Sequence, residues 1–327
     1  MAHYLLTGAA GFIGARVAEL LLDEAHSIAG VDNLNDAYDV RMKYWRLDRL
    51  KGRENFTFHR VDIGQRQEIE KVFDRYDATK FDAVINLAAR AGVRQSVIDP
   101  WVYMDTNITG TLNLLELCRH RNVPKFILAS TSSIYGADAS LPTPEQANSD
   151  FPLQPYAASK KAAEVLSHAY HYLYDIDVTV FRYFTVYGPA ARPDMVMFRF
   201  TQWISEGKPV KVNGDGEQSR GFTYVDDIAR GTISGLKPVG YEIINLGGHE
   251  SIKINQLISM MEQIIGKKAH IKYQPRHPAD MLANFADVGK AKQLLGWQPR
   301  FSLQKGIANL VAWYNAEQSW ASQVSTD

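Results

Sequence analysis

The sequence predicts an α/β protein: a doubly wound parallel sheet with a smaller, interleaved C-terminal domain. Short continuous apolar runs alternate with amphipathic segments through the first 182 residues. A glycine-rich turn directly follows the first apolar run, and the alternation stops after Arg182. Apolar strands without polar alternation, separated by helices, are typical of parallel sheets that helices cover on both faces.

The apolar runs predict strands at residues 3–7, 27–31, 55–61, 82–88, 125–130 and 178–182. Amphipathic stretches between most of them predict helices at residues 12–24, 65–76, 101–121 and 156–174. Crossovers between parallel strands are right-handed, so this order of elements winds helices onto both faces of the sheet.

Beyond Arg182, the pairs Gly188-Pro189 and Arg192-Pro193 and the run 214–216 indicate turns. Helices are predicted at residues 195–206, 254–265 and 303–317, and residues 222–236 and 241–246 are predicted to return to the sheet as strand or helix. We therefore assign residues 1–182 and 220–249 to the sheet domain. Residues 183–219 and 250–327 are assigned to the smaller domain.

Composition excludes several classes of protein. Lys plus Arg and Asp plus Glu both number 36, so the chain lacks the basic field expected of a nucleic-acid binder. The one cysteine, Cys118, lies in an apolar stretch and predicts a buried thiol without a disulfide, and the histidines form no ligand cluster that would predict a metal. Without a membrane-length apolar run or a basic N-terminal leader, we expect no membrane association and a cytoplasmic protein.

The turn after the first predicted strand favours a dinucleotide. Glycines there allow unusual backbone angles and close approach of a pyrophosphate, and the start of the following helix offers free N–H groups. A tight turn alone would also explain three glycines, but the position between the first strand and the first helix favours the nucleotide. The candidate residues are Gly8, Gly11, Phe12, Ile13 and Gly14.

Asp32 ends the second predicted strand, about 20 residues beyond the glycines, where a carboxylate receives the adenosine ribose. The same charge would repel a 2′-phosphate, which favours NAD over NADP, although Asp32-Asn33 is also a good start for a loop. Further cofactor candidates follow the third and fourth strands, where two alanines are small enough for a cofactor to pass closely. They are Asp62, Ile63, Leu87, Ala88 and Ala89.

Tyr156 and Lys160 lie four residues apart after Pro155, and therefore on one face of a predicted helix. A lysine ammonium lowers the pKa of a phenol, and a phenolate can take a proton from an alcohol while hydride leaves for NAD. Tyr76 and Lys80 have the same spacing, so spacing alone is not specific. The helix after Pro155 is distinguished by its expected place beside the nucleotide edge of the sheet.

Three hydroxyl residues, Thr131, Ser132 and Ser133, follow the fifth predicted strand. Side chains at the carboxyl ends of parallel strands face the ligand crevice of a doubly wound sheet. A serine-rich loop that caps itself is the alternative.

Together these features resemble the extended short-chain dehydrogenase/reductase family over nearly the whole chain. The matching motifs are residues 7–14, Asp32, 107–111, Thr131, 156–160, 182–184, 214–216, 222–227 and 294–297. The resemblance implies a Rossmann sheet domain that binds NAD, with Asn107 and Tyr183 also at the cofactor. It implies a catalytic trio of Thr131, Tyr156 and Lys160, and a nucleotide sugar bound by the smaller domain.

Within this family, sugar dehydratases carry an Asp-Glu pair beside the threonine and uronate decarboxylases a Glu, where this chain has Ser132 and Ser133. Return of hydride to the other face of a 4-ketone, a 4-epimerisation, is then the simplest outcome. Segments 32–40 and 185–195 resemble the subgroup that converts UDP-glucuronate to UDP-galacturonate. A UDP-glucose or UDP-N-acetylglucosamine epimerase, or another nucleotide-sugar oxidoreductase, is the alternative, and Arg192 is the discriminating feature.

The carboxylate of a hexuronate needs hydroxyl donors and a cation. The candidates are Thr131, Ser132, Ser133, Thr185 and Arg192. The resemblance implies uracil contacts at Lys211, Val212 and Asn213 and a diphosphate contact at Arg220. Arg276 is the candidate for a second diphosphate contact, and Asp280 is a further candidate substrate residue. Gly221 and His277 depart from the family pattern, and both arginines at positions 192 and 220 could instead be solvated loop residues.

The resemblance also implies a homodimer built on the helices at residues 101–121 and 156–174, both apolar on more than one side. Core packing alone would also explain that apolar character.

Overall fold

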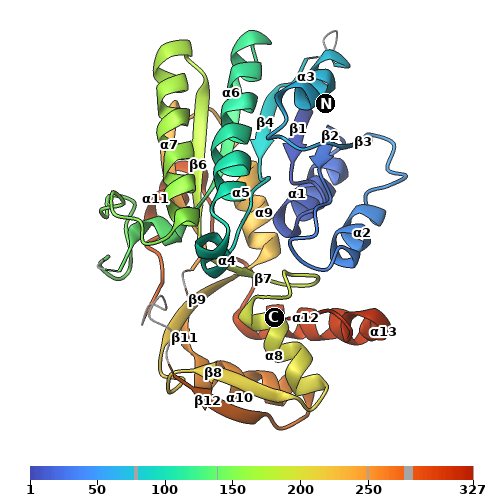
Figure 1. The fold of residues 1–327 in the computed structure, drawn as a ribbon, viewed down its shortest axis with the longest axis vertical. Coiled ribbons are helices and arrows are strands. Elements are labelled where there is room, and N and C mark those ends of the chain that lie inside the picture. The colour runs from blue at the N-terminus through green and yellow to red at the C-terminus, as the bar shows by residue number, and fades with distance from the viewer. Residues whose placement is uncertain (77–79, 138, 249, 276–282, 327) are drawn as a thin grey trace.

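The computed structural model describes residues 1–76, 80–137, 139–248, 250–275 and 283–326 (Figure 1). Seven strands form one sheet, in the spatial order β10 (Tyr241–Leu246), β6 (Asp177–Tyr183), β5 (Lys125–Thr131), β4 (Ala83–Asn86), β1 (His3–Thr7), β2 (Ser27–Asp32) and β3 (Phe56–Arg60). Every neighbouring pair is parallel. The predicted α/β class and doubly wound parallel sheet are therefore confirmed.

Consecutive residues of a central strand face opposite sides of the sheet, and both sides are apolar. Leu5 and Val84 belong to one core, whereas their neighbours Leu6 and Ile85 belong to the other. The first core is covered by α3 (Arg66–Asp74), α6 (Gly110–His120) and α7 (Pro155–Tyr174). The second is covered by α1 (Phe12–Asp23), α2 (Arg41–Asp48), α9 (Val225–Ser234) and α11 (Gly289–Leu295). Burial of both faces explains the unbroken apolar runs.

The chain order reverses at β1, which has β2 on one side and β4 on the other. The connections after β1 and β4 therefore leave toward opposite faces of the sheet and open a crevice at the carboxyl ends of these strands. The phosphate turn of residues 8–14 follows β1, so the fold puts the predicted cofactor residues at this crevice.

Two smaller sheets lie below the large one in Figure 1. One contains β11 (Glu250–Lys253), β9 (Ser219–Tyr224) and β7 (Thr185–Tyr187), in that order, and the other pairs β12 (His270–Gln274) with β8 (Pro209–Asn213). They pack with α8 (Val196–Ser205), α10 (Ile254–Ile265) and α12 (Leu303–Ala316). The predicted domain boundaries stay a prediction. Most of β9 falls in residues 220–249, which were assigned to the sheet domain, yet β9 pairs with β7 and β11 and not with the large sheet.

The predicted helix at residues 101–121 is interrupted. It comprises α5 (Trp101–Tyr103), a π-helical turn η1 (Met104–Thr109) and α6. The range 222–236 likewise combines the end of β9 with α9, whereas 241–246 is the strand β10. Three short helical segments were not predicted, because no apolar period marks them in the sequence. They are α4 (Val93–Ile98), the 3-10 turn η2 (Ser132–Tyr135) and α13 (Gln318–Ala321).

Helix α2 was also not predicted, because two of its four buried residues are Lys43 and Arg46. Buried cations break the apolar period by which an amphipathic helix is recognised.

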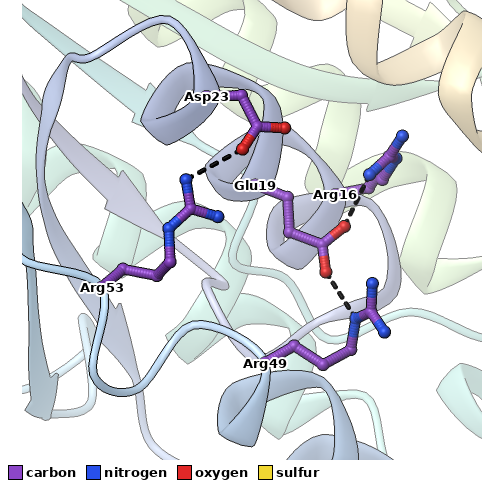
Figure 2. A pocket seen from close by; sticks show the side chains of 5 residues that line it. All are labelled: Arg16, Glu19, Asp23, Arg49 and Arg53. Carbon is purple, nitrogen blue, oxygen red and sulfur yellow. Dashed lines mark hydrogen bonds and ion pairs between the residues drawn. The ribbon is translucent and has the colours of Figure 1, made fainter.

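A charged hollow between α1 and α2 is lined by five ionic side chains (Figure 2). Glu19 accepts from Arg16 at 2.7 Å and from Arg49 at 2.6 Å, and Asp23 accepts from Arg53 at 2.8 Å. Arg16 also pairs with Asp226 of α9 at 2.8 Å. Each of the three arginines therefore has a carboxylate partner, and the hollow joins helices rather than offering free charge to a ligand. No helix in the described part of the chain combines the length and hydropathy that a bilayer crossing requires.

Candidate active site

The glycines of the phosphate turn are required by close packing. Gly8 has φ +69°, and a Cβ there would lie 2.8 Å from the backbone nitrogen of Ala88. A Cβ on Gly14 would lie 2.1 Å from the carbonyl oxygen of Gly8. The turn therefore sits directly against Leu87 and Ala88 at the end of β4, and a side chain at either glycine would push these segments apart.

The turn also suits an anion. Gly11 caps the twelve-residue helix α1 without a side chain, and its own N–H donates to the Gly8 carbonyl at 2.8 Å. Within the described chain, the N–H groups of residues 12–14 donate to no backbone carbonyl. Free N–H groups at the positive end of a helix bind phosphates, so the residues present fit a dinucleotide pyrophosphate.

Asp32 is fixed at the end of β2, where its carboxylate accepts from the Leu34 N–H at 2.8 Å and from the Ala10 N–H at 3.3 Å. Asn33 donates to Asp62 at 2.8 Å, which brings the ends of β2 and β3 together. This grouping suits the adenosine end of NAD. The side chain of Ile63, by contrast, is turned into the core.

Thr131, Tyr156 and Lys160 are brought together from β5 and α7. The Thr131 hydroxyl lies close enough to the Tyr156 phenol to oppose the rise of its pKa, and it donates to the Ser133 hydroxyl at 3.2 Å. The Lys160 ammonium is buried and donates to the carbonyl of Ala129 at 2.8 Å. The three residues predicted as catalytic therefore lie in one cluster at the carboxyl end of β5.

Burial acts on both titratable groups of this cluster. It raises the pKa of the Tyr156 phenol, against the opposing effects of the Thr131 hydrogen bond and the positive charge of Arg192. Burial also lowers the pKa of Lys160 to about 8, partly offset by the carboxylate of Glu164. Lys160 is thus mostly protonated at neutral pH. For Tyr156 to act as a base, nearby cations must lower the pKa of its phenol against the effect of burial.

One turn after Lys160 on α7, a buried ion pair joins this helix to the sheet. Glu164 accepts from Arg182 at 2.8 and 3.0 Å and from the Ser130 hydroxyl at 2.5 Å. Both ionic side chains are 2% exposed. The pair therefore fixes α7, and with it Tyr156 and Lys160, against β5 and β6.

Asn107 lies in the π-helical turn and has both ends of its amide occupied. It donates to the Arg90 carbonyl at 3.0 Å and to the Ser159 hydroxyl at 2.9 Å, and it accepts from the Arg90 N–H at 2.9 Å. Ser159 in turn donates to the Tyr156 carbonyl at 2.8 Å. Through these hydrogen bonds Asn107 stabilises the first turn of α7. Its contact with the cofactor stays a prediction.

Tyr183 places its hydroxyl 2.8 Å from Thr232 of α9, on the face of the sheet opposite α7. Its predicted cofactor contact is untested, but the hydroxyl is already bonded within the core.

Arg192 is partly buried and lies near Tyr156. It forms a two-point ion pair with Asp194, at 3.0 and 2.6 Å, and its charge acts on the phenols of Tyr156 and Tyr103. The Tyr103 ring meets the Tyr156 ring edge-on at 6.0 Å, and its hydroxyl donates to the Gly92 carbonyl at 3.0 Å. Sequence reasoning missed Tyr103, which belongs to no motif, and it gave no role to Asp194, although Asp194 lies within the segment 185–195.

Two further candidates for the sugar carboxylate lie beside this cluster. Ser132 begins η2 directly after Thr131, and Asn284 donates to its hydroxyl at 3.4 Å. Thr185 begins β7, two residues beyond the end of β6. Thr131 and Tyr183 are partners in the β5–β6 register, so Ser132 and Thr185 continue from neighbouring strands.

The candidates for the UDP moiety lie farther from Tyr156. Lys211, Val212 and Asn213 belong to β8, low in Figure 1, with Lys211 exposed and Val212 buried. Arg220 lies on β9. Arg276, His277 and Asp280 fall outside the described residues.

Gly221, which departs from the family pattern, has a packing reason. A Cβ there would lie 2.5 Å from the carbonyl oxygen of Gly248, so β9 and the segment after β10 approach as only glycine permits.

Within the described residues, no three His, Cys, Asp or Glu side chains gather to hold a metal ion. Sheet, phosphate turn and Thr-Tyr-Lys cluster together define a nucleotide-dependent enzyme of the short-chain dehydrogenase type. The model of the NAD dependent epimerase/dehydratase family matches residues 4–247, and the chain belongs to this family, which confirms the predicted resemblance.

Particular relatives share more than the family. A UDP-glucuronate 4-epimerase of Thermodesulfobacterium geofontis is 58% identical over 314 residues, which are 96% of each chain. The Bacillus cereus UDP-glucuronic acid 4-epimerase, solved with UDP-glucuronic acid and NAD, is 37% identical with a TM-score of 0.89, over 96% of this chain and 99% of that one. A UDP-glucose 4-epimerase of Thermotoga maritima, solved with UDP-glucose, also has a TM-score of 0.89, at 32% identity over 97% and 99%.

Proposed function

We propose that this enzyme is a UDP-glucuronate 4-epimerase, an isomerase that interconverts UDP-glucuronate and UDP-galacturonate with a bound, unconsumed NAD. The observation that carries the proposal is the positive charge of Arg192 acting on Tyr156, in a chain where Ser132 and Ser133, not acidic residues, follow Thr131. The 58% identity to an enzyme of that name supports the same substrate.

The residues divide the chemistry between them. Tyr156 accepts the proton of the C4 hydroxyl, Thr131 orients the phenol, and the ammonium of Lys160 stabilises the phenolate. NAD, when bound, supplies the acceptor for the C4 hydride and returns it to the opposite face of the ketone. Tyr156 then gives its proton back to the C4 oxygen, so no group is consumed.

Proton NMR of the purified enzyme with UDP-glucuronate, and separately with UDP-glucose, tests this assignment. We expect the product with an axial C4 hydroxyl from UDP-glucuronate and far less from UDP-glucose. Inversion of UDP-glucose alone would transfer the assignment to the neutral-sugar alternative.

Arg192 is proposed to hold the C6 carboxylate, with Ser132, Ser133 and Thr185 as hydroxyl donors. The 4-keto intermediate is a β-keto acid and loses carbon dioxide when its C–C bond aligns with the ketone orbital. Holding the carboxylate out of that alignment would protect the intermediate. Because Asp194 pairs with Arg192 at two points, that ion pair must loosen or share the guanidinium when substrate binds.

Arg192→His is therefore expected to lower the rate of epimerisation and to release a UDP-pentose by-product. Chromatography of the reaction mixture, with NMR of each UDP-sugar, measures both effects. Arg199→His, on α8 with its guanidinium bonded to the Thr326 carbonyl, is the matched control and should leave the product unchanged. Unaltered kinetics without pentose in Arg192→His would remove the proposed role.

We further propose that the enzyme is a homodimer joined through α6 and α7. Three apolar side chains of α7 are largely exposed: Val165 at 59%, Tyr172 at 81% and Leu173 at 62%. A symmetric pairing of these helices would cover them. A cytoplasmic location is likewise proposed, on a lone thiol, Cys118, that is buried and whose pKa burial raises.

Light scattering during gel filtration is expected to give about twice the chain mass of 36.8 kDa for the wild type. Val165→Lys with Leu173→Lys should give the single-chain mass, because two buried charges would face each other across the pairing. The control is Ile271→Lys, an exposed apolar position on β12. A wild-type chain that elutes as a monomer would contradict the proposal.

A further inference from the structure

Helix α2 carries a buried guanidinium that the chemistry above does not use. Arg46 is 3% exposed, and its partners in the described structure are two carbonyl groups and one phenol, with no carboxylate among them. A buried cation is costly unless its donors are satisfied, so the buried guanidinium depends on the carbonyl and hydroxyl groups that accept its hydrogen bonds.

The two carbonyl groups belong to different loops. One guanidinium nitrogen of Arg46 donates to the Ala10 carbonyl of the phosphate turn at 2.8 Å. The other two donate to the Ala190 carbonyl at 3.0 and 2.8 Å. Ala190 has φ +53° and lies two residues before Arg192, in the loop that links β7 to α8. Arg46 thus bridges the cofactor turn and the Arg192 loop directly.

Tyr38 strengthens this bridge. Its hydroxyl accepts from Arg46 at 2.9 Å, and its ring faces both Arg46 and Lys43 at 5.5 Å. Lys43, one turn earlier on α2, lies 3.5 Å from Asp32. One helix therefore contacts the pyrophosphate end and the ribose end of the cofactor site, and it also contacts the loop of Arg192.

We propose that Arg46 is a positioning residue that couples the NAD-binding turn to the Arg192 loop, so that NAD and the hexuronate stabilise each other's binding. The inference rests on the proposed function, because it takes Arg192 as the carboxylate ligand. When NAD orders residues 10–11, the Ala10 carbonyl is held in place, and with it the guanidinium of Arg46. The guanidinium in turn holds the Ala190 carbonyl, and so the loop of Arg192. Binding linkage is reciprocal, so UDP-glucuronate must in turn hold NAD in place.

The test is the release of NAD from the holoenzyme, with and without saturating UDP-glucuronate, in a Tyr156→Phe background that performs no chemistry. We expect UDP-glucuronate to slow NAD release by at least about fivefold, and UDP, which lacks the carboxylate, to slow it less. Adding Arg46→Lys keeps the positive charge, but an ammonium replaces the planar guanidinium that reaches both carbonyl groups. The slowing by UDP-glucuronate should then fall close to the value for UDP.

Arg49→Lys is the matched control, since it lies on the same helix but pairs with Glu19 in the hollow of Figure 2. It should retain the full effect. In otherwise wild-type protein, Arg46→Lys should also raise KM for UDP-glucuronate more than it lowers kcat. Should Arg46→Lys fail to fold, Tyr38→Phe, which removes one partner of the same guanidinium, carries the test and should weaken the effect.

The coupling would be overturned if UDP-glucuronate slowed NAD release equally with and without Arg46→Lys. It would also be overturned if Arg49→Lys reduced the slowing as much as Arg46→Lys does. Absence of a C4-inverted product from the wild type would instead overturn the proposed function. The two failures are distinguishable, because the release experiment involves no turnover.

Discussion

Tyr156→Phe is expected to lower kcat by about 10²-fold or more while NAD stays bound. The substitution removes one hydroxyl, the group whose pKa is raised by burial and lowered by Thr131 and by the positive charge of Arg192. Phenylalanine keeps the ring and its edge contact with Tyr103, so the loss isolates the proton transfer from the packing. Initial rates by NMR and the NAD content of the purified protein measure the two quantities.

Tyr76→Phe is the matched control, because Tyr76 also has a lysine four residues on. Its hydroxyl lies 2.8 Å from His59, far along the chain from the cluster of Thr131, and the rate should stay near that of the wild type. A Tyr156→Phe enzyme that retains its rate would displace the phenol from its role as base.

Glu164→Leu is expected to lower the free energy of unfolding by about 3–5 kcal/mol, because it leaves the Arg182 guanidinium buried without a counter-charge. Leucine keeps most of the side-chain volume, so the loss reports the charge rather than a cavity. Urea unfolding followed by circular dichroism measures it. Glu217→Leu removes an exposed pair with Lys253 and should leave the free energy of unfolding close to that of the wild type.

The double variant Glu164→Leu, Arg182→Met sharpens this result. Removing both charges should recover part of the stability, since no unpaired ion remains in the interior. A double variant as unstable as the sum of the two single variants would show that packing, not charge, is what the pair supplies.

Elements with an unbroken apolar period were predictable from sequence. Helix α10 and strand β10 have the predicted bounds, and β1, β2, β5, β6 and α7 agree within one or two residues. The two-stranded sheet of β8 and β12 was missed, because all five residues of β12 are exposed and β8 buries only Val210 and Val212, which is too little apolar sequence to mark a strand. The π-helical turn at Asn107 was also missed, since side-chain hydrogen bonds rather than apolar spacing accompany it.

The same distinction applies to the site. Thr131, Tyr156 and Lys160 were found because local motifs carry them, and the structure brings all three together. Tyr103, Asp194 and Arg46 were not found. Tyr103 and Arg46 acquire their places only when segments distant in sequence meet, such as the turn at Ala10 and the loop at Ala190, so no short pattern marks them. Asp194 lies only two residues from its partner Arg192, but their pairing is a matter of side-chain geometry, which the sequence does not give.

The path of the chain between its sheets limits how this enzyme can be recombined. After β6 the chain leaves the large sheet for β7, it returns at β10 following β9, and it leaves again at β11. A chimaera that exchanges sugar preference with a relative must therefore transplant two separate stretches at once. A single crossover placed between β7 and β9 would pair β9 with a foreign β7, and one placed between β9 and β11 would pair it with a foreign β11.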